Sequence, residues 1–433
     1  MVKNGLKLGL FVGILVLLMI VERMQRSMFK NASIEQISRI QQNDTPATVA
    51  FFKFIYNIGD TRCYFIFVML LFNFVSRQTS FYFAFVLCAN VFTETFMKLA
   101  FQDGRPFMQT SKIFPFVCEL EFGNPAVEAM NCVAFAFALG FFAYERLKEQ
   151  DEELSDKQKV SIALGILMSL IMIILFCLQG IYNGTNSIDQ VLFGVELGLF
   201  IATFSHFFVR EALEKHVTNV MDGLYVNRYR QAVLGFLVAF LCAFVVVTLY
   251  YALAVSRFKA PGSWLYQISV KCPVSQQITE LIFQDAVYVE YGLMFYLAGA
   301  YFGLIVDAKY FRGTIRSVND TSVRKKMTRV VLSALPIVPI FVCPVFLIAS
   351  LRFIFAVLAV KYGLPAFMIG FLLFGYSKPV YERFNLTNEY DSTLTLESSM
   401  NMGRLEEVEE EKEFTGKKRD KMYEEGLQEQ STY

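Results

Sequence analysis

The chain has 433 residues, of which 55% are hydrophobic and 18% are charged, and its formal net charge is +1. The apolar residues form long uncharged blocks, whereas a soluble chain of this length carries about 25% charged residues and scatters its apolar ones. The near-neutral charge, and the lack of a basic stripe, a Walker loop, a dinucleotide glycine pattern or zinc-type cysteine spacing, exclude a soluble nucleic-acid-binding or nucleotide-binding protein. The sequence therefore predicts an integral membrane protein with no cofactor and no bound metal.

The first apolar run covers residues 8–21 and follows Lys3 and Lys7. A secretory signal peptide has such a run, but no small-x-small cleavage site follows it here. We therefore predict a retained anchor helix within residues 1–30.

Nine further apolar runs are each long enough to cross a hydrocarbon core of roughly 30 Å. Prolines interrupt the last two runs, so these either kink or form a shallow hairpin. Together the runs predict an all-α polytopic membrane protein, a bundle of about ten transmembrane helices. The nine are 62–77, 80–97, 130–145, 160–180, 188–209, 232–256, 286–306, 328–350 and 353–376.

The apolar blocks stop at residue 376. Residues 377–433 contain an acidic run at 406–413 and a basic cluster at 417–419. Such a mixed-charge stretch cannot bury a core, so we expect a disordered or loosely helical cytosolic tail. A docking peptide for a partner is the alternative.

Lysine and arginine are enriched in alternate loops, which indicates the orientation in the membrane. The richer loops, among them the strongly basic 309–329, are predicted to be cytosolic together with both termini. The loops 22–61, 98–129, 181–187 and 257–285 then face the lumen or the exterior. Glycosylation sequons at Asn31 and Asn43 lie on that side. So do Cys118 and Cys272, which makes them a candidate disulfide.

Three segments on this predicted luminal side carry polar motifs. Lys98 is followed after six residues by Arg105 and Pro106 at a membrane exit. Residues 118–130 lie just before a span, and residues 180–194 join the next two spans.

The order and spacing of these segments resemble the type 2 phosphatidic acid phosphatase superfamily, which includes the lipid phosphatases and glucose-6-phosphatase. The first motif of that superfamily, Lys-x6-Arg-Pro, is matched in full. Of the second, Pro-Ser-Gly-His, only Pro125 is present, but its flanks are similar to the glucose-6-phosphatase branch. The third motif falls on Gln179, Gly180, Asn186 and Gln190. The resemblance covers residues 51–211 and implies a six-helix phosphatase-like core, followed by C-terminal transmembrane helices at 212–376.

The resemblance also implies a catalytically degenerate site. Asn186 stands where the superfamily has its nucleophilic histidine, and Glu128 stands where it has the acid histidine. Gly180 removes a phosphate-binding guanidinium and Ala126 removes a hydroxyl donor. The only two histidines, His206 and His216, lie at the predicted cytosolic end of a span. An imidazole nucleophile is therefore missing.

The retained cations Lys98 and Arg105 have two interpretations. In the first, Glu128 neutralises one of them and forms an internal salt-bridge network. In the second, they still hold a phosphate or an anionic lipid headgroup without cleaving it.

The sequence thus favours a non-catalytic, phosphatase-like membrane protein that acts as a scaffold or as a binder of anionic lipid or phosphate. An active luminal phosphatase of lipid or sugar phosphates is the first alternative. A transporter or channel is the second, although Glu94 and Glu196 are the main mid-span charges and no internal repeat is present. Membrane lipids are the expected partners, and the expected location is the endoplasmic reticulum, another secretory endomembrane or the plasma membrane.

Overall fold

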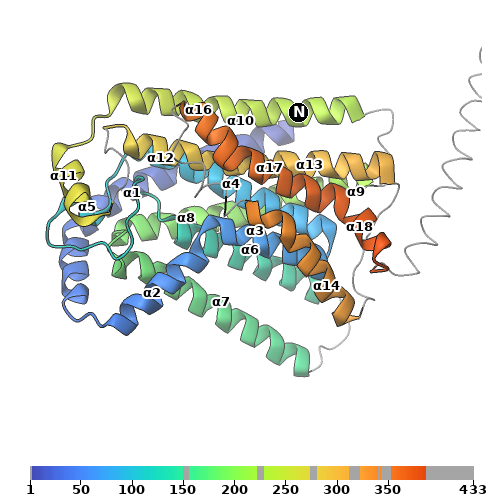
Figure 1. Ribbon diagram of the computed structural model, residues 1–433, viewed down its shortest axis with the longest axis horizontal. Coiled ribbons are helices and arrows are strands. Elements are labelled where there is room, and N and C mark those ends of the chain that lie inside the picture. The colour runs from blue at the N-terminus through green and yellow to red at the C-terminus, as the bar shows by residue number, and fades with distance from the viewer. Residues whose placement is uncertain are drawn as a thin grey trace, which may run out of the picture.

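The protein is an elongated bundle of helices that run mostly along its long axis (Figure 1). The computed structural model describes residues 2–149, 156–221, 229–273, 280–311, 322–339, 342 and 353–386, and these residues form helices and loops without a strand. The all-α prediction is therefore confirmed.

Seven of the described helical stretches are long and apolar enough to cross a membrane, and a bent helix pair would make an eighth. The sequence predicts about ten. The difference arises because residues 340–341 and 343–350 of the predicted span 328–350 lie outside the described residues, and because the first helix is not among the seven. The seven are Arg77–Gln109, Val127–Glu145, Val160–Tyr182, Ile188–Met221, Val233–Arg257, Ile282–Phe311 and Ile354–Arg383.

The N-terminal part is more helical than predicted. Helix α1 (Val2–Gln41) contains the predicted anchor run but continues far into the segment expected as a luminal loop. Helix α2 (Pro46–Gly59) follows, because Thr45 caps it: the Thr48 amide donates to Thr45 Oγ1 over 3.2 Å. Helix α3 (Thr61–Phe74) starts at the N-cap Asp60 and is bent by 58° relative to α2.

The centre of the bundle is formed by α4 and by the α12–α13 stretch, whose apolar windows are each 72% buried. Helices α6 and α8 pack directly against each other. Two glycines of α8 permit this close packing. A Cβ at Gly194 would lie 2.5 Å from the backbone oxygen of Ala126, just before α6, and a Cβ at Gly198 would lie 2.5 Å from that of Met130 in α6. The bounds are α4 (Arg77–Phe101), α5 (Pro106–Gln109), α6 (Val127–Glu149), α7 (Asp156–Tyr182), α8 (Ile188–Phe204), η1 (Ser205–Val209), α9 (Arg210–Met221), α10 (Tyr229–Arg257), α11 (Gly262–Lys271), α12 (Ile282–Glu290), η2 (Tyr291–Met294), α13 (Phe295–Val306) and η3 (Asp307–Phe311).

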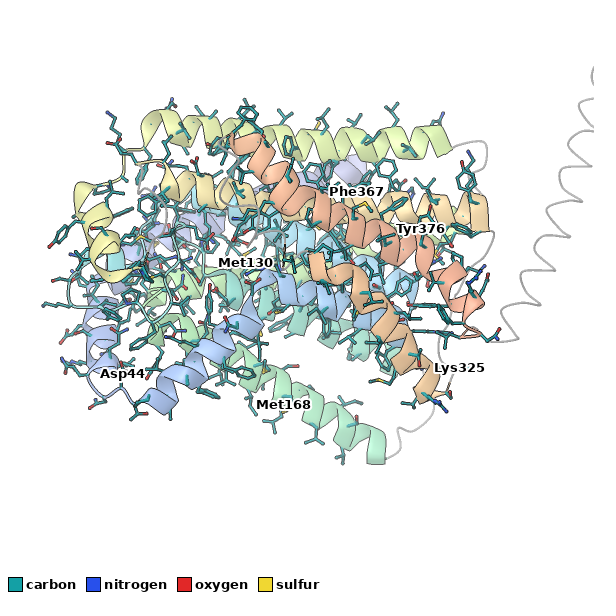
Figure 2. The ribbon with its side chains drawn as sticks, in the orientation of Figure 1. Asp44, Met130, Met168, Lys325, Phe367 and Tyr376 are labelled. Carbon is teal, nitrogen blue, oxygen red and sulfur yellow. A yellow bond between two sulfur atoms is a disulfide. The ribbon has the colours of Figure 1, made fainter. Side chains whose placement is uncertain are left out.

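Helices α7 and α10 form the edges of the bundle (Figure 1). Only 6% of each apolar window is buried, so both present aliphatic side chains outward, as lipid-facing helices do. Figure 2 shows the contrast between Met168, which lies on α7 at the edge, and Met130, which lies inside the bundle.

The C-terminal helices continue beyond residue 376, where the sequence predicts the start of the tail. Tyr381 is buried and donates a hydrogen bond to Asn73 over 2.7 Å, and Arg329 donates to the backbone oxygen of Leu386 over 2.9 Å. These contacts fix the segment on the bundle, while residues 387–433 with the acidic run lie outside the described part. The bounds are α14 (Val323–Ala334), η4 (Leu335–Ile337), α16 (Ile354–Val357), η5 (Leu358–Gly363), α17 (Leu364–Phe371), η6 (Leu372–Tyr376) and α18 (Ser377–Arg383).

The segments predicted to be luminal gather at one end of the bundle, where α5 and α11 lie (Figure 1). Helices α9 and α18 lie toward the opposite end. The polar motifs therefore share one end of the molecule, and this positions the candidate site.

We expect Gly194→Ala to lower the stability of the purified protein by about 1–3 kcal/mol, because the added methyl group meets the backbone oxygen of Ala126. Gly140→Ala is the matched control, since a Cβ there has no heavy atom within 4 Å. The measurement is thermal unfolding in detergent. Equal unfolding temperatures for the two variants would contradict the close packing of α6 and α8.

Candidate functional site

The motifs surround a polar cavity of about 280 Å³. Its wall is formed by the α2–α3 bend, α4, α6, α12 and the loop that precedes α6. Five glutamates line it: Glu94, Glu119, Glu121, Glu128 and Glu290. The cavity is therefore acidic, which the sequence motifs did not indicate.

Lys98 lies in the last turn of α4 and is completely buried. Its ammonium group donates to Glu94 Oε1 over 2.8 Å and to Glu121 Oε1 over 2.6 Å. Glu94 is one helical turn earlier on the same face, since residues four apart are neighbours on a helix. Both partners are carboxylates, so the lysine charge is neutralised within the protein.

Arg105 follows the left-handed residue Gln102, which ends α4 and turns the chain back across the site. Its guanidinium forms ion pairs with Glu119 and with Glu121, the latter over 2.7 Å. Its other N–H groups donate to the backbone oxygens of Glu121 and Thr185, each over 3.1 Å. Arg105 is thus fully occupied by acceptors of the protein itself.

Glu121 bridges the two cations through one oxygen, Oε1. Burial alone would raise the pKa of Glu121, but Lys98 and Arg105 together hold that pKa below its ordinary value. This contribution to stability is present at neutral pH and is lost as the pH falls through the depressed pKa.

Glu128 is not the partner of either cation. Within the described residues, the ion pairs of Lys98 and Arg105 go to Glu94, Glu119 and Glu121. The first interpretation of the retained cations is therefore wrong about the partner, because Glu128 pairs with neither cation. A salt-bridge network does form, as that interpretation expected. The physical reason is the path of the loop before α6, which places the carboxylates of Glu119 and Glu121 in contact with the two cations.

Glu128 instead lies in the first turn of α6 and faces the cavity. It is only 7% exposed. Among the described residues, no side chain donates a hydrogen bond to its carboxylate or forms an ion pair with it.

Asn186 is buried beside Arg105. Its amide group donates to the backbone oxygen of Gly123 over 2.9 Å, and its side-chain oxygen accepts from Thr185 Oγ1 over 3.2 Å. Its backbone amide bonds the oxygen of Gly180 over 3.0 Å. The side chain is therefore fixed by its neighbours and offers no basic lone pair.

Gly180 and Ala126 lie in the same packed region. A Cβ at Gly180 would lie 3.0 Å from the side-chain oxygen of Asn186, so a larger residue needs that side chain to move. The buried Ala126 donates its amide to the oxygen of Gln190 over 3.1 Å. All four degenerate positions thus surround the retained cations or the cavity wall.

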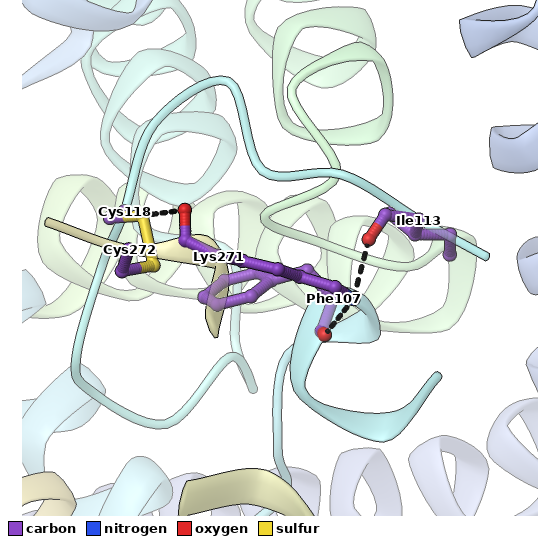
Figure 3. The surroundings of a disulfide bond; sticks show 5 residues. All are labelled: Phe107, Ile113, Cys118, Lys271 and Cys272. Carbon is purple, nitrogen blue, oxygen red and sulfur yellow. Dashed lines mark hydrogen bonds between the residues drawn. A yellow bond between two sulfur atoms is a disulfide. The ribbon is translucent and has the colours of Figure 1, made fainter. Parts of the chain in front are cut away.

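A disulfide joins Cys118 and Cys272, the predicted pair (Figure 3). Next to it, Lys271 donates to the backbone oxygens of Phe107, Thr110 and Ile113 over 2.6–3.0 Å. These bonds attach α11 to α5 and to the loop that carries Glu119 and Glu121, and so hold the acidic wall in place.

The two histidines lie away from the cavity. His206 contacts Glu145 over 2.9 Å, and His216 contacts the Tyr301 hydroxyl over 3.0 Å. Neither imidazole lines the cavity.

Residues 79–213 match the family model of the PAP2 superfamily. This stretch, which contains Lys98, Arg105, Glu128 and Asn186, is similar to that superfamily of phosphatase-like domains, and the protein is a helical polytopic membrane protein. The predicted superfamily is confirmed for this part of the chain. No curated protein and no solved structure matches the chain.

Glu119, Glu121 and Glu290 are site residues that the sequence analysis missed. Glu121 lies in the second motif segment, residues 118–130. The closeness of this segment to the first motif could have indicated that its carboxylate meets Lys98 and Arg105. Glu290 lies in a C-terminal span outside the matched region and carries no motif.

We expect Lys98→Met to destabilise the protein by about 3–5 kcal/mol, because it leaves Glu94 and Glu121 as buried carboxylates with one cation fewer. Adding Glu94→Gln to this variant should restore part of the loss. Lys112→Met is the control, since Lys112 is exposed on the neighbouring loop. The measurement is thermal unfolding in detergent, and strict additivity of the two changes would contradict the network.

Proposed function

We propose that the PAP2 domain of this protein is non-catalytic, and that the protein acts as a pseudophosphatase scaffold of the glucose-6-phosphatase-like branch. The observation that carries the proposal is Asn186. It stands at the nucleophile position of the superfamily motif, and its amide group is held by Gly123 and Thr185. An amide nitrogen cannot attack phosphorus, because its lone pair is delocalised.

No neighbouring histidine supplies the missing nucleophile. Histidine phosphatase chemistry needs an imidazole nucleophile and a titratable acid within reach of the substrate. Both histidines have partners outside the cavity. Losing a nucleophile costs several orders of magnitude in rate, and other members of the unit do not compensate.

The charge of the cavity supports the same conclusion. Lys98 and Arg105 are paired with Glu94, Glu119 and Glu121. The cavity wall itself carries six carboxylates, the five glutamates and Asp60, but only one cation among the described residues, Arg62. A phosphate dianion that entered the cavity would meet ionised carboxylates, and like charges at such distances repel.

Two alternatives keep specific support. Lys98 and Arg105 retain the full first motif, which favours binding of phosphate or an anionic lipid headgroup at these residues. Glu128 is a buried carboxyl with room beside it, which favours an active phosphatase that uses it as the acid.

The proposed location is a secretory endomembrane or the plasma membrane, with both termini in the cytosol and the site on the luminal or extracellular side. The disulfide supports this orientation, because disulfides persist on the oxidising side of such membranes.

The test of the proposed function is phosphate release by the purified protein from phosphatidic acid, a sphingoid phosphate, a diphosphate lipid and glucose 6-phosphate. We expect the native protein and its Asn186→Ala variant to give the same background rate. A variant with Asn186→His, Glu128→His, Ala126→Ser and Gly180→Arg shows whether the scaffold can still support catalysis. Adding Glu121→Gln removes the carboxylate that bridges the two cations. Native phosphate release that falls on Glu128→Gln would contradict the proposal and establish the active phosphatase.

We also expect inorganic phosphate and vesicles with phosphatidic acid to leave the unfolding temperature of the native protein unchanged, because carboxylates already occupy both cations. A Glu128→Ala variant removes the unpaired negative charge and should respond more strongly than the native protein. Saturable stabilisation of the native protein, abolished by Lys98→Met, would establish the anion-binding alternative instead.

A further inference from the structure

We propose that the polar cavity is a binding site for a hard divalent cation of the calcium class, with Glu94, Glu121 and Glu290 as ligands. The proposal goes beyond the proposed function, because cation binding does not depend on whether the domain hydrolyses phosphate esters.

Three chain segments bring the ligands together. Glu94 lies in α4, Glu121 in the loop before α6, and Glu290 at the end of α12. One carboxylate oxygen from each lies within 4.8 Å of the others. Calcium binds oxygen at about 2.3–2.6 Å, so an ion between the three carboxylates can reach all of them.

Glu128 provides an independent reason for a cation. It is not one of the three ligands, yet it faces the same cavity while being only 7% exposed. Among the described residues, no side chain donates a hydrogen bond to its carboxylate and no cation forms an ion pair with it. A buried carboxylate with no partner is costly unless a cation compensates it.

The ligand oxygens remain available after the salt bridges are formed. Glu121 uses Oε1 for both Lys98 and Arg105, and its Oε2 is buried without a hydrogen-bond partner. Glu290 forms no ion pair among the described residues and opens into the cavity. Six carboxylates line the cavity, namely Asp60 and the five glutamates, whereas the described cations on or next to its wall are Arg62, Lys98 and Arg105. The site therefore keeps an excess of negative charge that a divalent ion would balance.

The donor set identifies the class of ion. The described residues that line the cavity include neither a histidine nor a free thiol, since Cys118 is in the disulfide. Oxygen-only sites suit calcium, magnesium and manganese, whereas zinc and copper prefer nitrogen and sulfur. The cavity of about 280 Å³ leaves room for the waters that complete six to eight ligands around calcium.

The experiment uses the full chain, purified in detergent and stripped with a chelator. Calcium binding is measured by equilibrium dialysis and by thermal unfolding, at an ionic strength fixed with potassium chloride. Magnesium, manganese and choline chlorides are run in parallel. We expect saturable calcium binding and a rise in the unfolding temperature that choline does not produce.

Glu290→Gln is the decisive variant, because Glu290 is outside the Lys98–Arg105 network and its loss should leave that network intact. We expect a loss of calcium affinity of at least about tenfold. Glu280→Gln is the matched control, since Glu280 is exposed shortly before α12 and should bind as the native protein does. Glu128→Gln, which also spares the network, should weaken binding as well and serves if Glu290→Gln does not fold.

Three results would overturn the proposal. The first is the absence of saturable binding of any of the three divalent ions. The second is a Glu290→Gln or Glu128→Gln variant that folds and binds as tightly as the native protein. The third is stabilisation by choline alone, which would assign the cavity to an organic ammonium group. No phosphate ester is present in these assays, so the result is separate from the test of phosphatase activity.

Discussion

The structure of the site depends on the carboxylate of Glu121, which binds both Lys98 and Arg105 through one oxygen. Burying two cations is costly unless their partners are fixed in a good geometry. Glu121 comes from a loop, and a loop alone is a weak support. The disulfide from Cys118 and the three hydrogen bonds of Lys271 attach this loop to α11, and they thereby supply the rigidity that the ion pairs need.

In the same arrangement, carboxylates of the protein occupy the two cations of the Lys-x6-Arg-Pro motif. An arginine fork binds carboxylate and phosphate with similar geometry, so Glu119 and Glu121 are effective competitors for the position of a phosphate. Once they occupy Arg105, the motif can persist in the sequence for structural reasons, since losing either cation would leave buried carboxylates unpaired. A match to the Lys-x6-Arg-Pro motif therefore does not by itself indicate a working phosphate site.

Much of the fold could be predicted from the sequence, because uncharged apolar runs and motif spacing depend on local chemistry. The apolar runs predict the spans around α4, α6, α7, α8, α10 and α13. The motif spacing predicts that Lys98, Arg105 and Asn186 lie together. The partner of the cations could not be predicted. Glu119, Glu121 and Glu128 all lie in one segment, and only the path of the loop decides which carboxylates reach the cations. The meeting of Glu290 with Glu94 depends on tertiary packing of a distant helix, which leaves no local pattern.

Glu128 stands at a motif position and also faces the acidic cavity, so its charge bears on both. At the position of a catalytic acid, a carboxyl could protonate a leaving group. In this cavity, however, it lies beside other carboxylates and has neither an ion pair nor a side-chain donor among the described residues. Such a group must be neutralised, by a proton or by a cation, because an isolated buried charge is not stable. Both ways of neutralising it require the cavity to favour positive charge. A site that favours positive charge disfavours a phosphate dianion, and this conflict is the physical basis on which we propose that the domain is non-catalytic.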